Sequence, residues 1–111
     1  MKKVLLILCL LYKGLFAQDV VNQVLILNEG QFNYTTGQIE TPVTIGTYDP
    51  TSNNYSVVDT IEGARFASDL LIDGDYFYVA ADTQLLKYDL NSYELLNTCL
   101  LYTSDAADDT C

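Results

Sequence analysis

The scarcest charged side chains in this sequence are its cations, because only Arg65 and Lys87 follow position 13. Asp69 lies four residues after Arg65, and Glu29 closes the first apolar run of the chain. A guanidinium flanked by carboxylates can bind a polar ligand by charge-assisted hydrogen bonds, so Glu29, Arg65 and Asp69 form the predicted ligand-binding set. The alternative is a structural bridge in which Arg65 and a carboxylate join two parts of the fold.

A second candidate site is Asp73-Gly74-Asp75, which resembles the start of a calcium-binding loop. Calcium is the one cofactor that the sequence suggests, with Asp73 and Asp75 as its ligands. The later ligands and the closing glutamate of such a loop are absent. The alternative is therefore a tight turn between two strands, for which an Asp-Gly pair is typical.

One modification site is predicted at Thr60. The tripeptide Asp59-Thr60-Ile61 resembles the Asp-Ser/Thr-apolar O-glycosylation motif of some exported bacterial proteins. Thr60 would be the acceptor.

Composition excludes several classes of function. The 111 residues carry a formal net charge of -10, with no histidine. Such a chain cannot neutralise a run of phosphates, so nucleic acid is excluded as a partner. Without histidine, Ser-His and Cys-His catalysis are excluded, and zinc and copper sites lose their commonest ligand.

The two ends differ from the rest of the chain. Residues 1–17 have the pattern of a secretory signal peptide, with Lys2 and Lys3 before a short apolar run and Ala17 at the cleavage point. We expect this segment to be helical and removed on export. The alternative of a membrane anchor is disfavoured because the apolar run is much shorter than the ~20 residues that a spanning helix needs.

Residues 99–111 are predicted to be a non-native tail. The run 99–109 resembles the translation of a transposase-type sequencing adapter, and on this interpretation the native protein continues beyond Thr98. The alternative is a genuine acidic tail with a disulfide between Cys99 and Cys111. With the signal peptide and this tail set aside, residues 18–98 contain no cysteine.

The region between the two ends is predicted to be all-β. Short runs of β-branched and aromatic residues alternate with turn residues, and no long segment outside residues 1–17 has helical periodicity. Residues 30–42 are expected to form a long loop or a loose hairpin. Residues 76–81 are apolar throughout, which predicts a strand covered on both faces. Strands are expected at 24–27, 43–48, 55–61, 70–72, 76–81, 85–89 and 93–97.

An internal repeat favours a β-propeller. The segment from Thr47-Tyr48-Asp49 to Thr60 resembles the segment from Lys87-Tyr88-Asp89 to Thr98, and the two Tyr-Asp pairs lie 40 residues apart. A period on the order of 40 residues with four strands per unit is typical of a propeller blade. A β-sandwich or an irregular meander is the alternative.

The same motifs resemble a known family. At Tyr48-Asp49-Pro50, at residues 73–79 and at residues 87–92, the sequence is similar to the exported YncE-like propellers of the YVTN/NHL type. The resemblance spans residues 24–98 and implies a protein of six to eight blades, of which this chain holds nearly two. It transfers no catalytic residues. In a propeller, Glu29, Arg65 and Asp69 would lie near the mouth of the central channel.

These inferences give a domain plan and a set of functions. We expect a signal peptide at 1–17, a first, incomplete blade at 18–65, a second blade at 66–98, and the tail at 99–111. The protein would act at the cell surface, in the periplasm or after secretion, as a module that binds a polar ligand, a glycan or a surface protein. The alternatives are a lactonase-like hydrolase with an acidic calcium site and a surface-layer component that assembles with itself.

Overall fold

The computed structural model describes residues 20–101, and every regular element among them is a β-strand. The predicted signal peptide and residues 102–111 of the predicted tail lie outside the described residues. The all-β prediction is confirmed for the described region. The nine strands are β1 (Val24–Asn28), β2 (Gln31–Asn33), β3 (Gln38–Thr41), β4 (Val43–Asp49), β5 (Asn54–Ile61), β6 (Ala67–Asp73), β7 (Tyr76–Ala81), β8 (Gln84–Asp89) and β9 (Leu95–Leu100).

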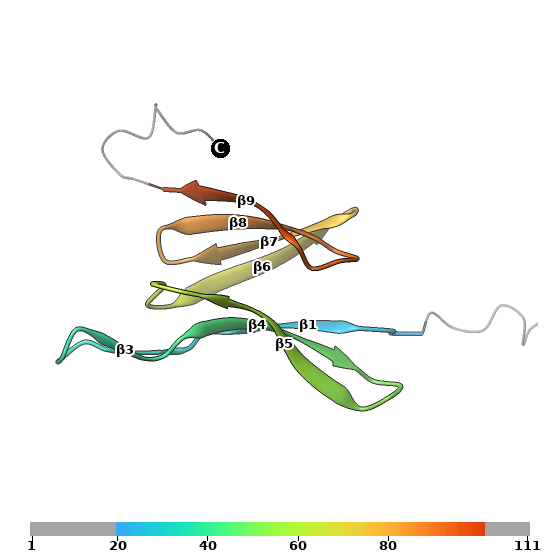
Figure 1. Ribbon diagram of the computed structural model, residues 1–111, viewed down its shortest axis with the longest axis horizontal. Coiled ribbons are helices and arrows are strands. Elements are labelled where there is room, and N and C mark those ends of the chain that lie inside the picture. Colours follow the sequence, from blue (N-terminus) through green and yellow to red (C-terminus); the bar gives the residue numbers. More distant parts are fainter. Residues whose placement is uncertain (1–19, 102–111) are drawn as a thin grey trace, which may run out of the picture.

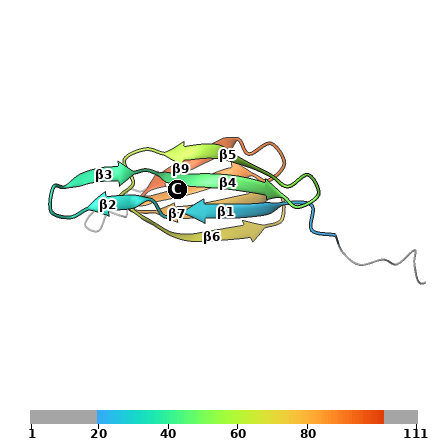
Figure 2. The ribbon, with the colours of Figure 1, turned by 90° about the horizontal axis from the view of Figure 1, so that it is seen from below.

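The strands form two layered sheets and a separate hairpin (Figure 1). The three-stranded sheet has the order β1-β4-β5, and the four-stranded sheet is a meander with the order β6-β7-β8-β9. All pairings are antiparallel. Strands β2 and β3 pair with each other and extend beyond one end of the two sheets (Figure 2).

The hairpin β2–β3 occupies the segment that was expected to be a loop or a loose hairpin. At its tip, the Asn33 side-chain oxygen accepts hydrogen bonds from the backbone N–H groups of Thr35 and Thr36 at 2.9 and 3.1 Å. Gly37 then takes a φ of 71°, which glycine adopts without a steric penalty. The turn therefore closes through local bonds of Asn33 and does not depend on the sheets.

The turns of the four-stranded sheet follow from their sequence. Asp73 pairs with Tyr76, so Gly74 and Asp75 form a two-residue hairpin loop, and Gly74 has a φ of 59°. Glycine at the first central position with positive φ gives the turn whose twist matches the flanking strands. The expected hairpin at the Asp-Gly pair is confirmed.

The hydrophobic core lies between the two sheets. Phe77 and Tyr88 are fully buried there, and their rings stack in parallel with centroids 4.7 Å apart. The Tyr88 hydroxyl donates a hydrogen bond of 2.6 Å to Oδ2 of Asp59 on β5, so a polar contact joins the sheets through the core. The other buried core residues are Val43, Ile45, Ile61, Ala64, Val79, Ala81 and Leu86.

Two turns have the same geometry 40 residues apart. Oδ1 of Asp49 accepts hydrogen bonds from the backbone N–H groups two and three residues later, at 2.8 and 3.4 Å, and Oδ1 of Asp89 does the same at 2.8 Å each. Both aspartates cap turns, so the two Tyr-Asp pairs of the repeat have the same structural role. The equivalence matches β1, β4 and β5 with β7, β8 and β9, while β6 has no counterpart among residues 20–101.

The alternation of side chains divides each sheet into two faces, which we name forward and rear. The forward face of the three-stranded sheet meets the core with Leu25, Leu27, Val43, Ile45 and Thr47. Its rear face carries Val24, Ile26, Gly46, Tyr48, Tyr55 and Val57. The rear face of the four-stranded sheet meets the core with Leu70, Phe77, Val79, Leu86 and Tyr88. Its forward face carries Leu71, Tyr76, Tyr78, Ala80, Leu85 and Lys87, together with Asp69, Asp73 and Asp89.

The burial of β7 differs from the sequence prediction. Phe77, Val79 and Ala81 on the rear face are fully buried, but Tyr76 on the forward face is exposed. Among residues 20–101 the three-stranded sheet covers one face of this strand, and no second sheet covers the other. The expectation that both faces of 76–81 are covered is therefore met on one face only.

The last strand also differs. The repeat predicted a strand at 93–97, whereas β9 begins at Leu95 and continues to Leu100. Tyr93 has a φ of 62° and belongs to the turn, so Leu95 is the residue opposite Tyr88. A left-handed backbone at Tyr93 delays the strand by two residues, which the aligned sequences did not reveal.

Candidate functional site

The most elaborate cluster of polar and aromatic side chains lies where the hairpin leaves the sheets, and we call it the hairpin-end cluster: Phe32, Tyr34, Arg65, Phe66 and Asp82. Its centre is a bidentate ion pair, in which Arg65 Nε and Nη2 donate to Asp82 Oδ2 and Oδ1, each at 2.7 Å. The backbone N–H of Arg65 also donates to Oδ2 at 3.2 Å. Three bonds thus tie the segment between β5 and β6 to the turn between β7 and β8.

Backbone conformation and aromatic rings position this ion pair. Asp82 takes a φ of 52° in its turn, a conformation that aspartate tolerates better than most residues. The Arg65 guanidinium carbon lies 5.9 Å from the ring centroid of Phe32 and 5.6 Å from that of Phe66, within the range of a cation–π interaction. Phe32 also meets the ring of Tyr34 edge to face, with centroids 4.9 Å apart.

The electrostatics follow from the pairing. The hydrogen bond from Arg65 holds the pKa of the Asp82 carboxyl below its usual value, and the same contact raises the pKa of Arg65. The side chain of Asp82 is only 9 % exposed, whereas that of Arg65 is 47 % exposed. One edge of the guanidinium is therefore paired with Asp82, while about half of the Arg65 side chain is exposed.

The structure does not bring the three residues of the predicted ligand-binding set together in one cluster of contacts. Arg65 pairs with Asp82, which that set did not include. Glu29 is exposed between β1 and β2, and Asp69 is exposed on β6, where its Oδ1 accepts a bond of 2.9 Å from the backbone N–H of Leu70. Neither carboxylate forms an ion pair with Arg65 within the described region. The structural alternative, an Arg65–carboxylate bridge, is the arrangement observed.

The predicted calcium ligands and the modification site have separate surroundings. Asp73 and Asp75 flank Gly74 in the tight turn, and the backbone oxygen of Asp75 accepts a bond of 2.9 Å from Leu90. Among residues 20–101 no three His, Cys, Asp or Glu side chains lie together so that they could hold a metal ion. Thr60 lies within β5, half-buried and opposite Thr44.

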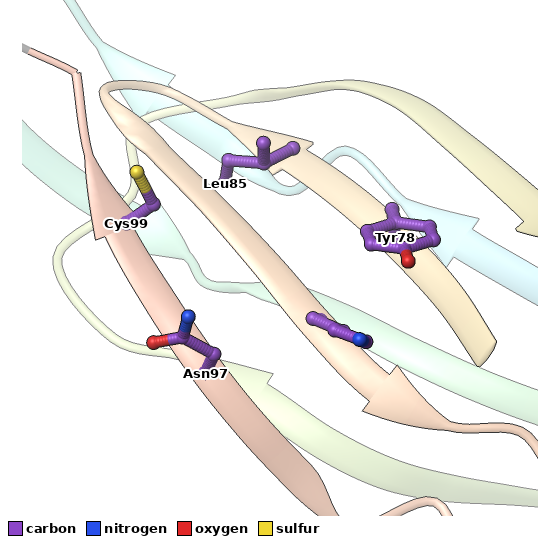
Figure 3. Close-up of a pocket in the computed structure, with 5 residues that line it drawn as sticks. Tyr78, Leu85, Asn97 and Cys99 are labelled. Atoms are coloured by element: carbon purple, nitrogen blue, oxygen red, sulfur yellow. The ribbon is translucent and has the colours of Figure 1, made fainter. Parts of the chain in front are cut away.

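A second surface feature lies on the forward face of the four-stranded sheet. A shallow depression of about 210 Å³ is lined by Tyr78, Leu85, Lys87, Asn97 and Cys99 (Figure 3). A second one, of about 160 Å³, shares Tyr78 and Leu85 with it and reaches Asp69 on β6. Lys87 Nζ lies 3.9 Å from the ring centroid of Tyr76 and 5.9 Å from that of Tyr78. This face thus combines apolar and aromatic side chains with the Lys87 cation above its rings and the Asp69 carboxylate on the edge strand β6.

Sequence reasoning missed Asp82, Phe32, Tyr34 and Phe66. Phe66 is adjacent to Arg65 in the sequence, and aromatic neighbours of a scarce cation are a usable indication. Asp82 lies 17 residues from Arg65. No local pattern connects Asp82 with Arg65, because the contact forms only when β7 and β8 pair and fix the turn that contains Asp82.

A comparison of the chain with protein-family models, with curated proteins and with solved structures finds no match. Residues 20–101 include no helix of the length and apolarity needed to cross a bilayer.

Proposed function

We propose that the chain belongs to an exported β-propeller of the YncE-like, YVTN/NHL type, in which the two sheets are successive blades. The protein would act at the cell surface or in the periplasm as a binding or scaffold module. Support comes from the equivalent turns at Asp49 and Asp89 and from the stacking of a forward face on a rear face. A repeated unit that packs in one sense can continue until the ring closes.

The hairpin-end cluster is the proposed binding site, and a polar glycan is the proposed ligand class. The observation that carries this is Arg65, whose guanidinium is paired with Asp82 and lies near two aromatic rings while the side chain remains 47 % exposed. Beside it, the ring of Tyr34 is 79 % exposed at the hairpin tip. An exposed ring gives an apolar platform for a sugar face, and an oriented guanidinium donates to its hydroxyl or acidic groups.

The hairpin adds further polar groups on its other face. The Glu40 carboxylate accepts hydrogen bonds from Gln31 Nε2 at 2.8 Å and from Asn33 Nδ2 at 2.7 Å. These three side chains hold one another in place along the strands. The hairpin therefore extends from the sheets with its polar side chains hydrogen-bonded to one another, which suits a contact surface.

The test is binding of the full chain to immobilised bacterial surface polysaccharides and oligosaccharides. We expect Tyr34→Ala and Arg65→Lys each to weaken binding about tenfold or more, because one removes the platform and the other the bidentate fork. Tyr76→Ala is the matched control, since it removes a tyrosine from the forward face, away from the hairpin. Binding that is absent, or lost equally in the control, would contradict the proposal.

A further inference from the structure

The two sheets leave one face of each kind uncovered by another sheet within the described residues. On the four-stranded sheet it is the forward face, where the side chains of Leu71 and Leu85 are 61 % and 37 % exposed. On the three-stranded sheet it is the rear face, where Val24, Tyr55 and Val57 are exposed. Contiguous apolar surface of this kind marks an interaction site in a soluble protein.

The two open faces correspond to the two faces that already pack together. With Tyr48 matched to Tyr88, the register matches Val24 with Phe77 and Ile26 with Val79 on the rear faces. On the forward faces it matches Leu25 with Tyr78, Leu27 with Ala80, and Ile45 with Leu85. Each of these pairs of equivalent positions has an apolar residue in both sheets.

We infer that a second copy of the 111-residue chain docks the rear face of its three-stranded sheet on the forward face of the four-stranded sheet. This inference rests on the proposed function, because the second copy takes the place where the proposed propeller puts its next blade. The contact would repeat the forward-to-rear packing that forms the core within one chain. It is heterologous, because different surfaces of the two copies meet. Within residues 20–101 each copy keeps one face of each kind without a second sheet on it, so copies add head to tail beyond the dimer.

The rear face of the three-stranded sheet lacks one side chain that the existing interface has, and a neighbouring ring fills its place. Leu86 on the rear face of the four-stranded sheet is matched by Gly46, which has no side chain. The ring of Tyr55 lies over Gly46 and fills the position where a Cβ would stand. Asn28 Nδ2 donates to the Tyr55 hydroxyl at 3.0 Å and holds the ring there. The rear face is therefore filled at this point, as the docking requires.

Charge sets the conditions for assembly. Thr47 is buried in the existing interface, and its counterpart on the open forward face is Lys87. The Lys87 ammonium already lies over Tyr76 and Tyr78, so its stem can be covered while its charge stays at the edge of the sheet.

Because each copy carries a net charge of -10, repulsion opposes stacking at low ionic strength. Added salt should therefore promote assembly.

The test is sedimentation velocity of the full chain over a hundredfold concentration range, at low and at moderate salt. We expect species larger than the monomer that grow with concentration and with salt. Leu85→Asp on the forward face and Val57→Asp on the rear face should each weaken self-association ~100-fold and leave the chain monomeric, because a carboxylate is then buried without a partner. Ile39→Asp on the hairpin is the matched control, since Ile39 is as exposed as Leu85.

Mixing the two variants gives the decisive result. Leu85→Asp retains an intact rear face and Val57→Asp an intact forward face, so an equimolar mixture should form a dimer that neither variant forms alone. A symmetric contact between like faces would instead leave one of the variants self-associating, which would overturn the inference. A monomeric wild type at every condition, or aggregation unaffected by either variant, would also overturn it. If circular dichroism shows that Leu85→Asp does not fold, Leu71→Asp takes its place in the mixture.

Discussion

The hydroxyl of Tyr88 donates a 2.6 Å hydrogen bond to Asp59 across the interface between the two sheets. Tyr88 is fully buried, and burial, followed by the bond to Asp59, raises the pKa of its phenol, which keeps the donor protonated. Its counterpart in the repeat is Tyr48, whose hydroxyl donates to Asn53 at 2.6 Å on the exposed rear face. Tyrosine thus occupies equivalent positions in the two sheets, and it is buried in the four-stranded sheet but not in the three-stranded sheet.

This pair gives a matched test of the interface. We expect Tyr88→Phe to lower the free energy of unfolding by about 1–2 kcal/mol, because the Asp59 carboxylate loses a buried partner. Tyr48→Phe should cost less than about 0.5 kcal/mol, because water replaces the lost bond. Urea denaturation followed by circular dichroism measures both. Equal losses would mean that the Tyr88 hydroxyl does not join the sheets.

Two valines test which face of each sheet is covered. Val79 is fully buried on the rear face of the four-stranded sheet, and Val57 is half exposed on the rear face of the other sheet. Val79→Ala should cost about 2–3 kcal/mol through lost burial and a cavity, and Val57→Ala about 0.5 kcal/mol. The two changes remove the same atoms from strands, so the difference between them reports the packing of the sheets. A larger loss for Val57 would contradict the stacking.

The ion pair of Arg65 with Asp82 predicts a dependence of stability on pH. The folded-state pKa of Asp82 lies below its ordinary value of 3.8, so the carboxylate contributes stability that is present above that value. This contribution is lost as the pH falls through the folded pKa. Asp82→Asn should therefore be less stable than the wild type near neutral pH, and the gap should close in acid. Thermal unfolding at about pH 6 and about pH 3 measures it.

Asp69→Asn is the control for that experiment, because Asp69 is an exposed aspartate of the same sheet with no ion pair in the described region. Its difference from the wild type should change less with pH. A gap for Asp82→Asn that stays constant in acid would show that the carboxylate is not stabilised by Arg65.

The turn caps at Asp49 and Asp89 predict that an oxygen, and not the charge, is the main requirement. Hydrogen bonds from the following backbone N–H groups lower the pKa of both carboxyls. We expect Asp89→Ala to lower the melting temperature clearly, and Asp89→Asn to restore most of the loss, because asparagine offers the same acceptor. The same pair of changes at Asp49 should behave alike. A failure of asparagine at both sites would mean that charge dominates.

The sequence predicted the strands well because their determinants are local. Alternation, β-branched residues and the Asp-Gly turn at residues 73–74 depend on near neighbours and appear in any short window. The start of β9 was misplaced because the left-handed backbone of Tyr93 leaves no mark in the sequence. The hairpin-end cluster could be predicted only in part. Arg65 was identified by its scarcity, but its partner Asp82 is set by how β7 and β8 are paired.

The central claim is that the two sheets are successive units of a longer array stacked in one sense. Sequencing the source locus through codons 97–111 and beyond tests it most directly. The account predicts that native DNA diverges from this sequence after Thr98 and encodes further Tyr-Asp units with a spacing of about 40 residues. Codons for residues 99–111 that are genuinely native and followed by a stop would contradict it, and the protein would then be a small β-domain of two sheets.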